Sequence, residues 1–73
     1  MPLSDFRRSQ FRSWGIEVRR DDEHSALLIV NPEANSYHTA IAVLTVCNGK
    51  SVRGHDVEAC GDTLLVNISF KTS

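Results

Sequence analysis

The alternation of apolar and polar side chains between residues 63 and 71 constrains the fold more than any other feature. Every second position in this segment is apolar, at Leu64, Val66, Ile68 and Phe70. In an extended chain these four side chains lie on one face, and the mostly polar residues between them lie on the other. An apolar strand face must pack against a second layer. We therefore predict a terminal strand over residues 63–71.

The segment before Gly15 has a helical period instead. Ser4 can cap the start of a helix, Asp5 suits its positive N-terminal dipole, and Gly15 can end it. The apolar and aromatic side chains of this segment fall within one arc of about 140° on a helical wheel. We therefore predict a short amphipathic helix over residues 4–14. So short a helix is marginal alone and needs a surface to pack on, either that of its own domain or that of a partner.

Two further strands are predicted between residues 16 and 30. Ile16 and Val18 alternate with charged residues, as in a half-buried strand. Residues 26–30 form a continuous apolar run, which is typical of a strand that is covered on both faces or paired centrally. The polar residues 21–24 predict a turn between the two strands. Asn31-Pro32 stops the second strand, and a loop continues to Ser36.

The next segment has the composition of a β-hairpin. β-branched residues dominate positions 39–47 and favour a strand, although Ala40 and Ala42 leave a helix open as the alternative. Asn48-Gly49 tolerates the positive φ angles of a type I′ turn, so we expect a tight hairpin with a return strand over residues 50–53. Residues 54–62 are then expected to form a polar loop or a bulged edge strand.

Together these segments predict a single α+β domain over residues 1–73. Its body, residues 15–73, is a small antiparallel sheet of four to five strands, curled or barrel-like. One short N-terminal helix or arm, residues 1–14, precedes the body. A chain of 73 residues buries only about 60% of the surface that its unfolded form exposes, so the core is thin. We do not expect a deep ligand pocket beside such a core, and binding to a partner would add stability.

Positive charge is concentrated at the N-terminus. The first twenty residues hold five of the eight cationic side chains and two of the nine acidic ones, so this segment is about +3 and the remainder about −4. Phe6, Phe11 and Trp14 are interleaved with these arginines. Such an asymmetry is typical of an interaction arm on a neutral or acidic body. The net charge of −1 argues against a domain that coats nucleic acid, although the arginines could still contact phosphate.

No constellation in the chain predicts catalysis, a cofactor or a metal. A zinc site could be assembled from Cys47, Cys60, His38 and His55, but these residues lack the close paired spacing of zinc ligands. His55 and Asp56 resemble a catalytic pair, but neighbours on a strand point to opposite faces and no nucleophile is evident. The acidic run 21–23 lacks the alternating pattern of a calcium loop, and the four glycines match no nucleotide-binding loop. We therefore expect a protein that is not an enzyme.

The cysteines and the N-terminal sequence favour a reducing cytoplasm. The first ten residues contain charged side chains and no apolar run of the kind found in secretory signals. No segment approaches the roughly 20 apolar residues of a membrane span. We therefore expect a cytoplasmic protein without membrane association, in which both cysteines are free thiols.

The arginine-rich and aromatic segment is the candidate binding site, with two interpretations. In the first, its aromatic side chains cover the sheet as a core helix, and the arginines only solvate the outer face. In the second, part of the aromatic set stays exposed, and Trp, Phe and Arg are the residue types that dominate binding hot spots. The second interpretation predicts three aromatic anchors with arginines at their rim, facing acidic groups or RNA phosphates. The six residues are Phe6, Arg7, Arg8, Phe11, Arg12 and Trp14.

In length and layout the chain resembles small bacteriophage-encoded regulators of bacterial RNA polymerase. The resemblance is carried by Phe6-Arg7-Arg8, Phe11-Arg12 and Trp14 at the start of a small body. It implies docking on the large polymerase subunits near the RNA exit path. It further implies inhibition of initiation by displacement of the specificity factor, antitermination, or both. We expect a monomer. The alternatives are a small nucleic-acid-binding module and a phage inhibitor of a bacterial defence complex.

Overall fold

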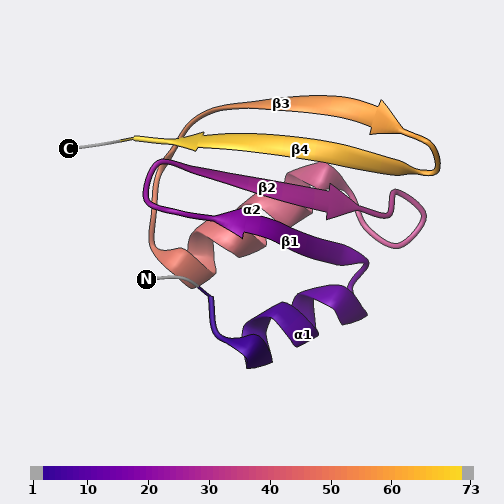
Figure 1. The fold of residues 1–73 in the computed structure, drawn as a ribbon, viewed down its shortest axis with the longest axis horizontal. Coiled ribbons are helices and arrows are strands. Elements are labelled where there is room, and N and C mark those ends of the chain that lie inside the picture. Colours follow the sequence, from indigo (N-terminus) through magenta and orange to yellow (C-terminus); the bar gives the residue numbers. More distant parts are fainter. Residues whose placement is uncertain (1–2, 72–73) are drawn as a thin grey trace.

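The computed structural model describes residues 3–71 and contains two helices and one four-stranded sheet in this range (Figure 1). The order is α1 (Asp5–Ser13), β1 (Ile16–Asp21), β2 (Ser25–Val30), α2 (Tyr37–Asn48), β3 (Val52–Cys60) and β4 (Thr63–Phe70). All neighbouring strands are antiparallel, in the order β1-β2-β4-β3. The α+β class, the four-stranded antiparallel sheet and the N-terminal helix are therefore confirmed. The sheet is open rather than closed into a barrel, and α2 is a second helix that the preferred assignment did not include.

Helix α1 spans Asp5–Ser13, within the predicted range 4–14, and is capped by Ser4 and Trp14. The Ser4 hydroxyl accepts a hydrogen bond from the Arg7 backbone N–H at 3.2 Å, which caps the first turn. The helix ends at Trp14, and Gly15 follows with a φ of 78° that favours glycine. A Cβ at residue 15 would also lie 2.6 Å from the Cβ of Ala34, so the chain here passes close to the loop after β2. The turn that joins α1 to the sheet therefore requires glycine for two reasons.

The strands predicted from Ile16 onward, at residues 26–30 and at residues 63–71 are confirmed, although β1 extends to Asp21, the first residue of the predicted turn. β1 and β2 form a hairpin, and the Asp22 backbone N–H donates to the Ser25 carbonyl oxygen at 2.9 Å in its turn. β2 then pairs along its whole length with β4, so β2 and β4 are the two central strands. The alternation in β4 places Val66, Ile68 and Phe70 in the core, as the sequence predicts.

The predicted strand over residues 39–47 is wrong, because this segment forms α2. Ser36 caps the helix by accepting the Thr39 backbone N–H at 3.1 Å. Ala40 and Leu44, one helical turn apart, are fully buried against the sheet. The apolar face of the four-stranded sheet needs a covering layer, which α2 supplies, and this requirement outweighs the modest strand preference of β-branched residues. The helical alternative that the alanines left open is the correct one.

The predicted type I′ hairpin at Asn48-Gly49 is also wrong. Gly49 ends α2 in the left-handed conformation, with φ 69° and ψ 17°, and its N–H donates to the Thr45 carbonyl oxygen at 2.9 Å. A positive φ is required both by this turn type and by a helix C-terminus, so the dipeptide alone does not distinguish them. The return strand over residues 50–53 is replaced by β3, which pairs with β4 and has a register shift between Val52 and Gly54. The bulged edge, rather than the polar loop, is therefore the correct alternative for residues 54–60.

One apolar core joins both helices to a single face of the sheet. Its buried side chains are Phe11, Ile16, Val18, Ala26, Leu28, Val30, Ala40, Leu44, Val66, Ile68 and Phe70. In Figure 1, α2 lies behind the strands and α1 runs beside β1. The strands in front of α2 face the viewer, which leaves the second face of the sheet outside this core.

Candidate functional site

The three aromatic side chains of the N-terminal segment have different environments. Phe11 is 0% exposed and belongs to the core, whereas Phe6 is 71% exposed and Trp14 is 38% exposed. The ring of Trp14 lies against that of Phe11, with 5.7 Å between their centroids. The core-helix interpretation therefore holds for the side of α1 that carries Phe11, and the other side keeps Phe6 and Trp14 exposed. Phe11 packs α1 onto the sheet, and Phe6 and Trp14 remain available at the surface.

Phe6 and Trp14 belong to one stripe along the outer side of α1. Phe6, Gln10 and Trp14 follow one another at intervals of four residues, so they lie on the same side of the helix. Arg7 flanks the stripe and donates a hydrogen bond from its guanidinium to the Gln10 side-chain oxygen at 3.1 Å. The stripe thus combines two aromatic side chains with a cation held beside them. We call Phe6, Arg7, Gln10 and Trp14 the α1 stripe.

Arg8 has a structural partner within the fold. Its guanidinium donates a hydrogen bond to the backbone carbonyl oxygen of Val18 at 2.7 Å, in a partly buried position. β1 is an edge strand, and this carbonyl lies next to the register shift between Val18 and Arg20. A side chain that covers an edge carbonyl limits pairing with other chains. Of the three arginines of α1, Arg7 and Arg12 are left exposed.

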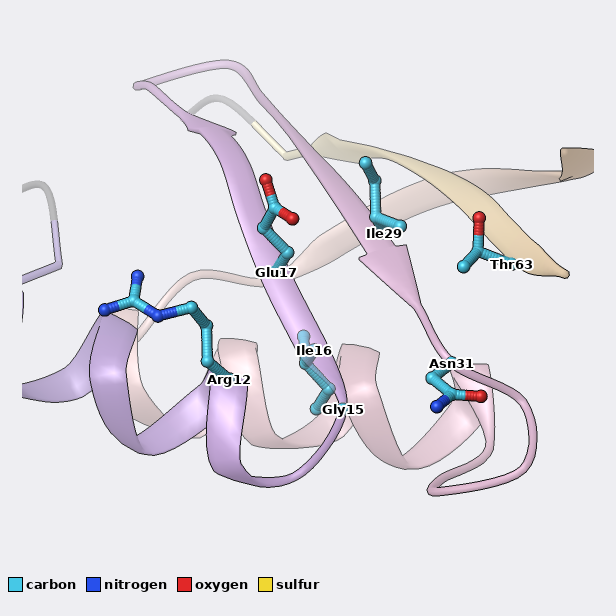
Figure 2. Close-up of a pocket in the computed structure, with 7 residues that line it drawn as sticks. All are labelled: Arg12, Gly15, Ile16, Glu17, Ile29, Asn31 and Thr63. Carbon is cyan, nitrogen blue, oxygen red and sulfur yellow. The ribbon is translucent and has the colours of Figure 1, made fainter. Parts of the chain in front are cut away.

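Arg12 borders a shallow hollow where α1 meets the sheet (Figure 2). The hollow has a volume of about 270 Å³. Its lining comes from α1, β1, β2, β4 and the turns beside them, namely Arg12, Gly15, Ile16, Glu17, Ile29, Asn31 and Thr63. Small-molecule sites are typically enclosed and span about 300–1,000 Å³. An open hollow of this size is better suited to one side chain of a partner, with Arg12 and Glu17 at its rim.

The sequence does not single out most residues of this hollow. Only Arg12 belongs to the predicted site, whereas Glu17, Ile29 and Thr63 lie far apart in the chain. Ile29 pairs with Glu17 on one side and with Leu65 on the other, so the strand register brings the lining together. Because the register of β2 with β4 depends on the whole sheet, no local motif could have indicated this hollow.

The histidines and cysteines do not assemble the zinc site that the sequence allowed. Tyr37, His38 and His55 form a surface cluster, in which the two imidazole centroids lie 6.4 Å apart. Within residues 3–71 no three His, Cys, Asp or Glu side chains gather closely enough to hold a metal ion. Cys47 is half-buried, Cys60 is exposed, and both are free thiols.

The adjacent His55 and Asp56 point to opposite sides of the sheet. His55 pairs with Ile68 of the covered face, whereas Asp56 pairs with Asn67 of the other face. Residues that are paired across strands share a face, so the two side chains cannot act on one substrate atom.

The acidic turn has a structural role at Asp22. The Asp22 carboxylate accepts the backbone N–H of Ser25 at 2.9 Å and that of His24 at 3.2 Å. These hydrogen bonds, that of Ser25 above all, lower the pKa of Asp22 below its ordinary value. An aspartate carboxylate that accepts hydrogen bonds from the backbone N–H groups two and three residues ahead stabilises a turn. Asp22 therefore closes the β1–β2 hairpin.

No family model, curated protein or solved structure matches the chain. Neither of the two described helices is long and apolar enough to cross a membrane.

Proposed function

We propose that this protein is a small non-enzymatic regulator that docks on a large protein partner through the α1 stripe. The observation that carries the proposal is the 71% exposure of Phe6, which is in line with Trp14 and flanked by Arg7. A large aromatic side chain that is left in water gains most when a partner covers it, because burial of apolar area is the main favourable term in association. Trp, Phe and Arg are also enriched among the residues that dominate binding energy.

The charges around the stripe favour an acidic groove on the partner. Arg7 and Arg12 are exposed on α1, and Asp5 is the only acidic residue of this helix. The two arginines would face carboxylates at the rim, where they increase the association rate and its salt dependence. Phe6 and Trp14 would occupy the apolar centre of the groove.

Bacterial RNA polymerase is the partner that we propose, on the strength of the resemblance to small phage regulators. In this proposal the chain acts in the bacterial cytoplasm, docks near the RNA exit path, and inhibits initiation or promotes read-through of terminators. The effect is steric and allosteric. RNA phosphates near the exit path would supply further contacts for the arginines.

The proposal is tested by measuring binding to purified bacterial RNA polymerase by biolayer interferometry, with and without nuclease. Phe6→Ala and Trp14→Ala are each expected to weaken binding by about 2 kcal/mol, or roughly 30-fold in Kd. The matched control is Val46→Ala, because Val46 is 83% exposed but lies on α2. A parallel run-off transcription assay should lose its inhibition with the two α1 variants only.

Three outcomes would contradict parts of this proposal. Absence of micromolar binding to the polymerase would exclude that partner. Binding that is insensitive to Phe6→Ala would exclude the α1 stripe. Binding that disappears on nuclease treatment would replace the protein partner with nucleic acid.

A further inference from the structure

The face of the sheet opposite α2 has no cover within residues 3–71. In Figure 1 α2 lies behind the strands, and the nearer face of the sheet is open. β2 nevertheless has apolar side chains on both faces: Ala26, Leu28 and Val30 are buried, while Leu27 and Ile29 lie on the open side. An antiparallel sheet with one face in water normally alternates apolar and polar residues. The pattern of β2 is that of a strand covered on both faces.

The apolar side chains of the open face gather at its centre. Leu27 and Ile29 of β2 and Leu65 of β4 are half-buried and line a broad hollow of about 600 Å³. Arg19, Arg20 and Cys60 border the same hollow. β2 and β4 are the central strands, so the aliphatic patch lies in the middle of the sheet.

The strand register arranges the open face in two rows that cross all four strands. Residues paired across neighbouring strands share a face and a level along the strands. The first row contains Arg20, Leu27, Asn67 and Asp56. The second row contains Glu17, Ile29, Leu65 and Glu58. Each row therefore begins at the edge strand β1 and ends at the edge strand β3.

The two edges of this face differ in how their charges are paired. The β1 edge has Arg19 and Arg20, whose guanidinium groups pair with the exposed carboxylates of Glu17 at 2.8 Å and Asp22 at 3.6 Å. The β3 edge has Asp56 and Glu58, which take part in no ion pair among residues 3–71. Along the first row the charge therefore changes from the cation Arg20 at the β1 edge to the anion Asp56 at the β3 edge, with the aliphatic patch between the two edges.

We propose that a second copy of this chain covers the open face. A two-fold axis parallel to the strands, between β2 and β4, would place β1 of each copy over β3 of the other. It would preserve the level along the strands, so Arg20 of one copy would face Asp56 of the second copy. Ile29 would face Leu65 in the same way, and both contacts would occur twice. The two sheets would pack about 10 Å apart, as in a β-sandwich.

This charge arrangement favours a second copy over an unrelated partner. The charges of the first row and the aliphatic patch complement their own image under one rotation, which a surface for a different protein has no need to do. In the second row Glu17 would face Glu58 of the second copy, and the Arg19 paired with Glu17 would supply the compensating charge. The inference does not depend on the α1 stripe, which belongs to a different element.

The size of the face indicates a weak dimer. Four strands spaced about 4.8 Å apart, each with roughly three to four residues on this face, bury at most on the order of 1,000 Å² in total across both copies. Interfaces at this lower limit are typical of transient complexes, so we expect a dissociation constant in the micromolar range. The monomer expected from the sequence is then the form at low concentration.

The decisive test is a charge exchange followed by sedimentation equilibrium from about 1 to about 500 μM. The natural chain should rise from 8.1 kDa toward twice this mass. Two variants, Arg19→Glu with Arg20→Glu and Asp56→Lys with Glu58→Lys, should each weaken the dimer by about tenfold or more through repulsion of like charges. An equimolar mixture of the two variants should restore the dimer, since each altered edge then meets an opposite charge. Arg7→Glu, which reverses an exposed charge on α1, is the control and should leave the dimer unchanged.

A second measurement needs no variant and therefore covers the case in which a charge exchange impairs folding. Amide NMR spectra of the natural chain at about 20 and about 500 μM should differ at residues of the open face, such as Leu27, Ile29 and Leu65, and not in α2. A natural chain that stays monomeric throughout the range would overturn the proposal. So would a mixture of variants that fails to restore the dimer, or shifts that are confined to α1.

Discussion

Phe11 and Phe6 lie five residues apart in one helix, and truncating each to alanine should change the free energy of unfolding by very different amounts. Phe11 is fully buried and contacts the core of the sheet, so Phe11→Ala removes its transfer energy and leaves a cavity. Substitutions of this kind cost about 3–5 kcal/mol. Phe6 is 71% exposed, and Phe6→Ala should change the free energy of unfolding by no more than about 0.5 kcal/mol. The expected difference therefore exceeds about 2.5 kcal/mol between two identical substitutions.

Urea unfolding followed by far-UV circular dichroism measures this difference. A chain of 73 residues is expected to have a free energy of unfolding of about 4–11 kcal/mol. With a slope near 1 kcal/mol per molar urea, Phe11→Ala should lower the midpoint by about 3 M or more. Trp14 is the single tryptophan and its ring lies 5.7 Å from that of Phe11, so its fluorescence gives a second, local signal. Phe11→Leu should fall between the natural chain and Phe11→Ala, and it remains measurable if the alanine variant does not fold.

The result that would refute this reasoning is a small effect at Phe11. A loss of less than about 1 kcal/mol on Phe11→Ala would mean that α1 adds little to the core and detaches readily. An equal loss at both positions would mean that Phe6 packs as well, and the α1 stripe would then have no exposed anchor. Only a large effect at Phe11 with a negligible one at Phe6 agrees with a helix that is buried on one side and free on the other.

Three further predictions concern the turns and the sheet edge. Gly15→Ala should lower the free energy of unfolding by about 2–4 kcal/mol, because it combines a left-handed φ with a methyl group 2.6 Å from a neighbouring side-chain carbon. In Gly49→Ala the added methyl group meets no atom within 4 Å, so the loss in the same urea assay should be about 1 kcal/mol. Arg8→Met should cost about 1 kcal/mol through loss of the 2.7 Å hydrogen bond to the Val18 carbonyl, and an unchanged midpoint would show that water replaces it fully. Because the pKa of Asp22 is lowered in the folded chain, its carboxylate stabilises the fold at pH values above the ordinary carboxylate pKa, and this contribution is lost as the pH falls through the folded-state pKa. The free energy of unfolding between about pH 2 and pH 6 should therefore depend less on pH in Asp22→Asn than in the natural chain. An unchanged pH profile would contradict this role of Asp22.

Local patterns are sufficient to predict the parts of the fold that combine period with a capping or turn residue. The strand β4 follows from its alternation, and α1 follows from the Ser4 cap and the terminal Gly15. The hairpin between β1 and β2 follows from its acidic turn. In each case the local preference and the tertiary environment agree, so the pattern is unambiguous.

The segment around α2 could not be assigned by the same means. Its β-branched residues suit a strand, and the Asn48-Gly49 pair suits a hairpin, yet Ser36 and Gly49 are also the two caps of a helix. The choice depends on the apolar face of a sheet formed largely by other segments, which Ala40 and Leu44 cover. The alternation in β4 indicates that a second layer is needed, but nothing within residues 37–48 shows that this segment supplies it.

The rotation of α1 about its axis was equally undetermined, and it decides which residues can bind a partner. The apolar arc of about 140° includes both Phe6 and Phe11, so the helical wheel alone does not show which of them meets the sheet. Long-range contacts fix the rotation: Gly15 turns the chain into β1, and Arg8 reaches the edge carbonyl of Val18. The predicted site therefore divides into Phe11 and Arg8, which hold the helix in place, and Phe6, Arg7, Arg12 and Trp14, which remain exposed.

The two proposed binding surfaces lie on different elements, and this separation has a measurable consequence. If two copies associate through the open face of the sheet, the α1 stripe of each copy remains free, so the dimer offers two equivalent docking sites. A partner held densely on a surface should then retain the natural chain longer than a sparse one, because the second contact becomes intramolecular. The variant Asp56→Lys with Glu58→Lys should lose this density dependence and keep its affinity for a single site. Loss of both would show that the sheet face itself contacts the partner.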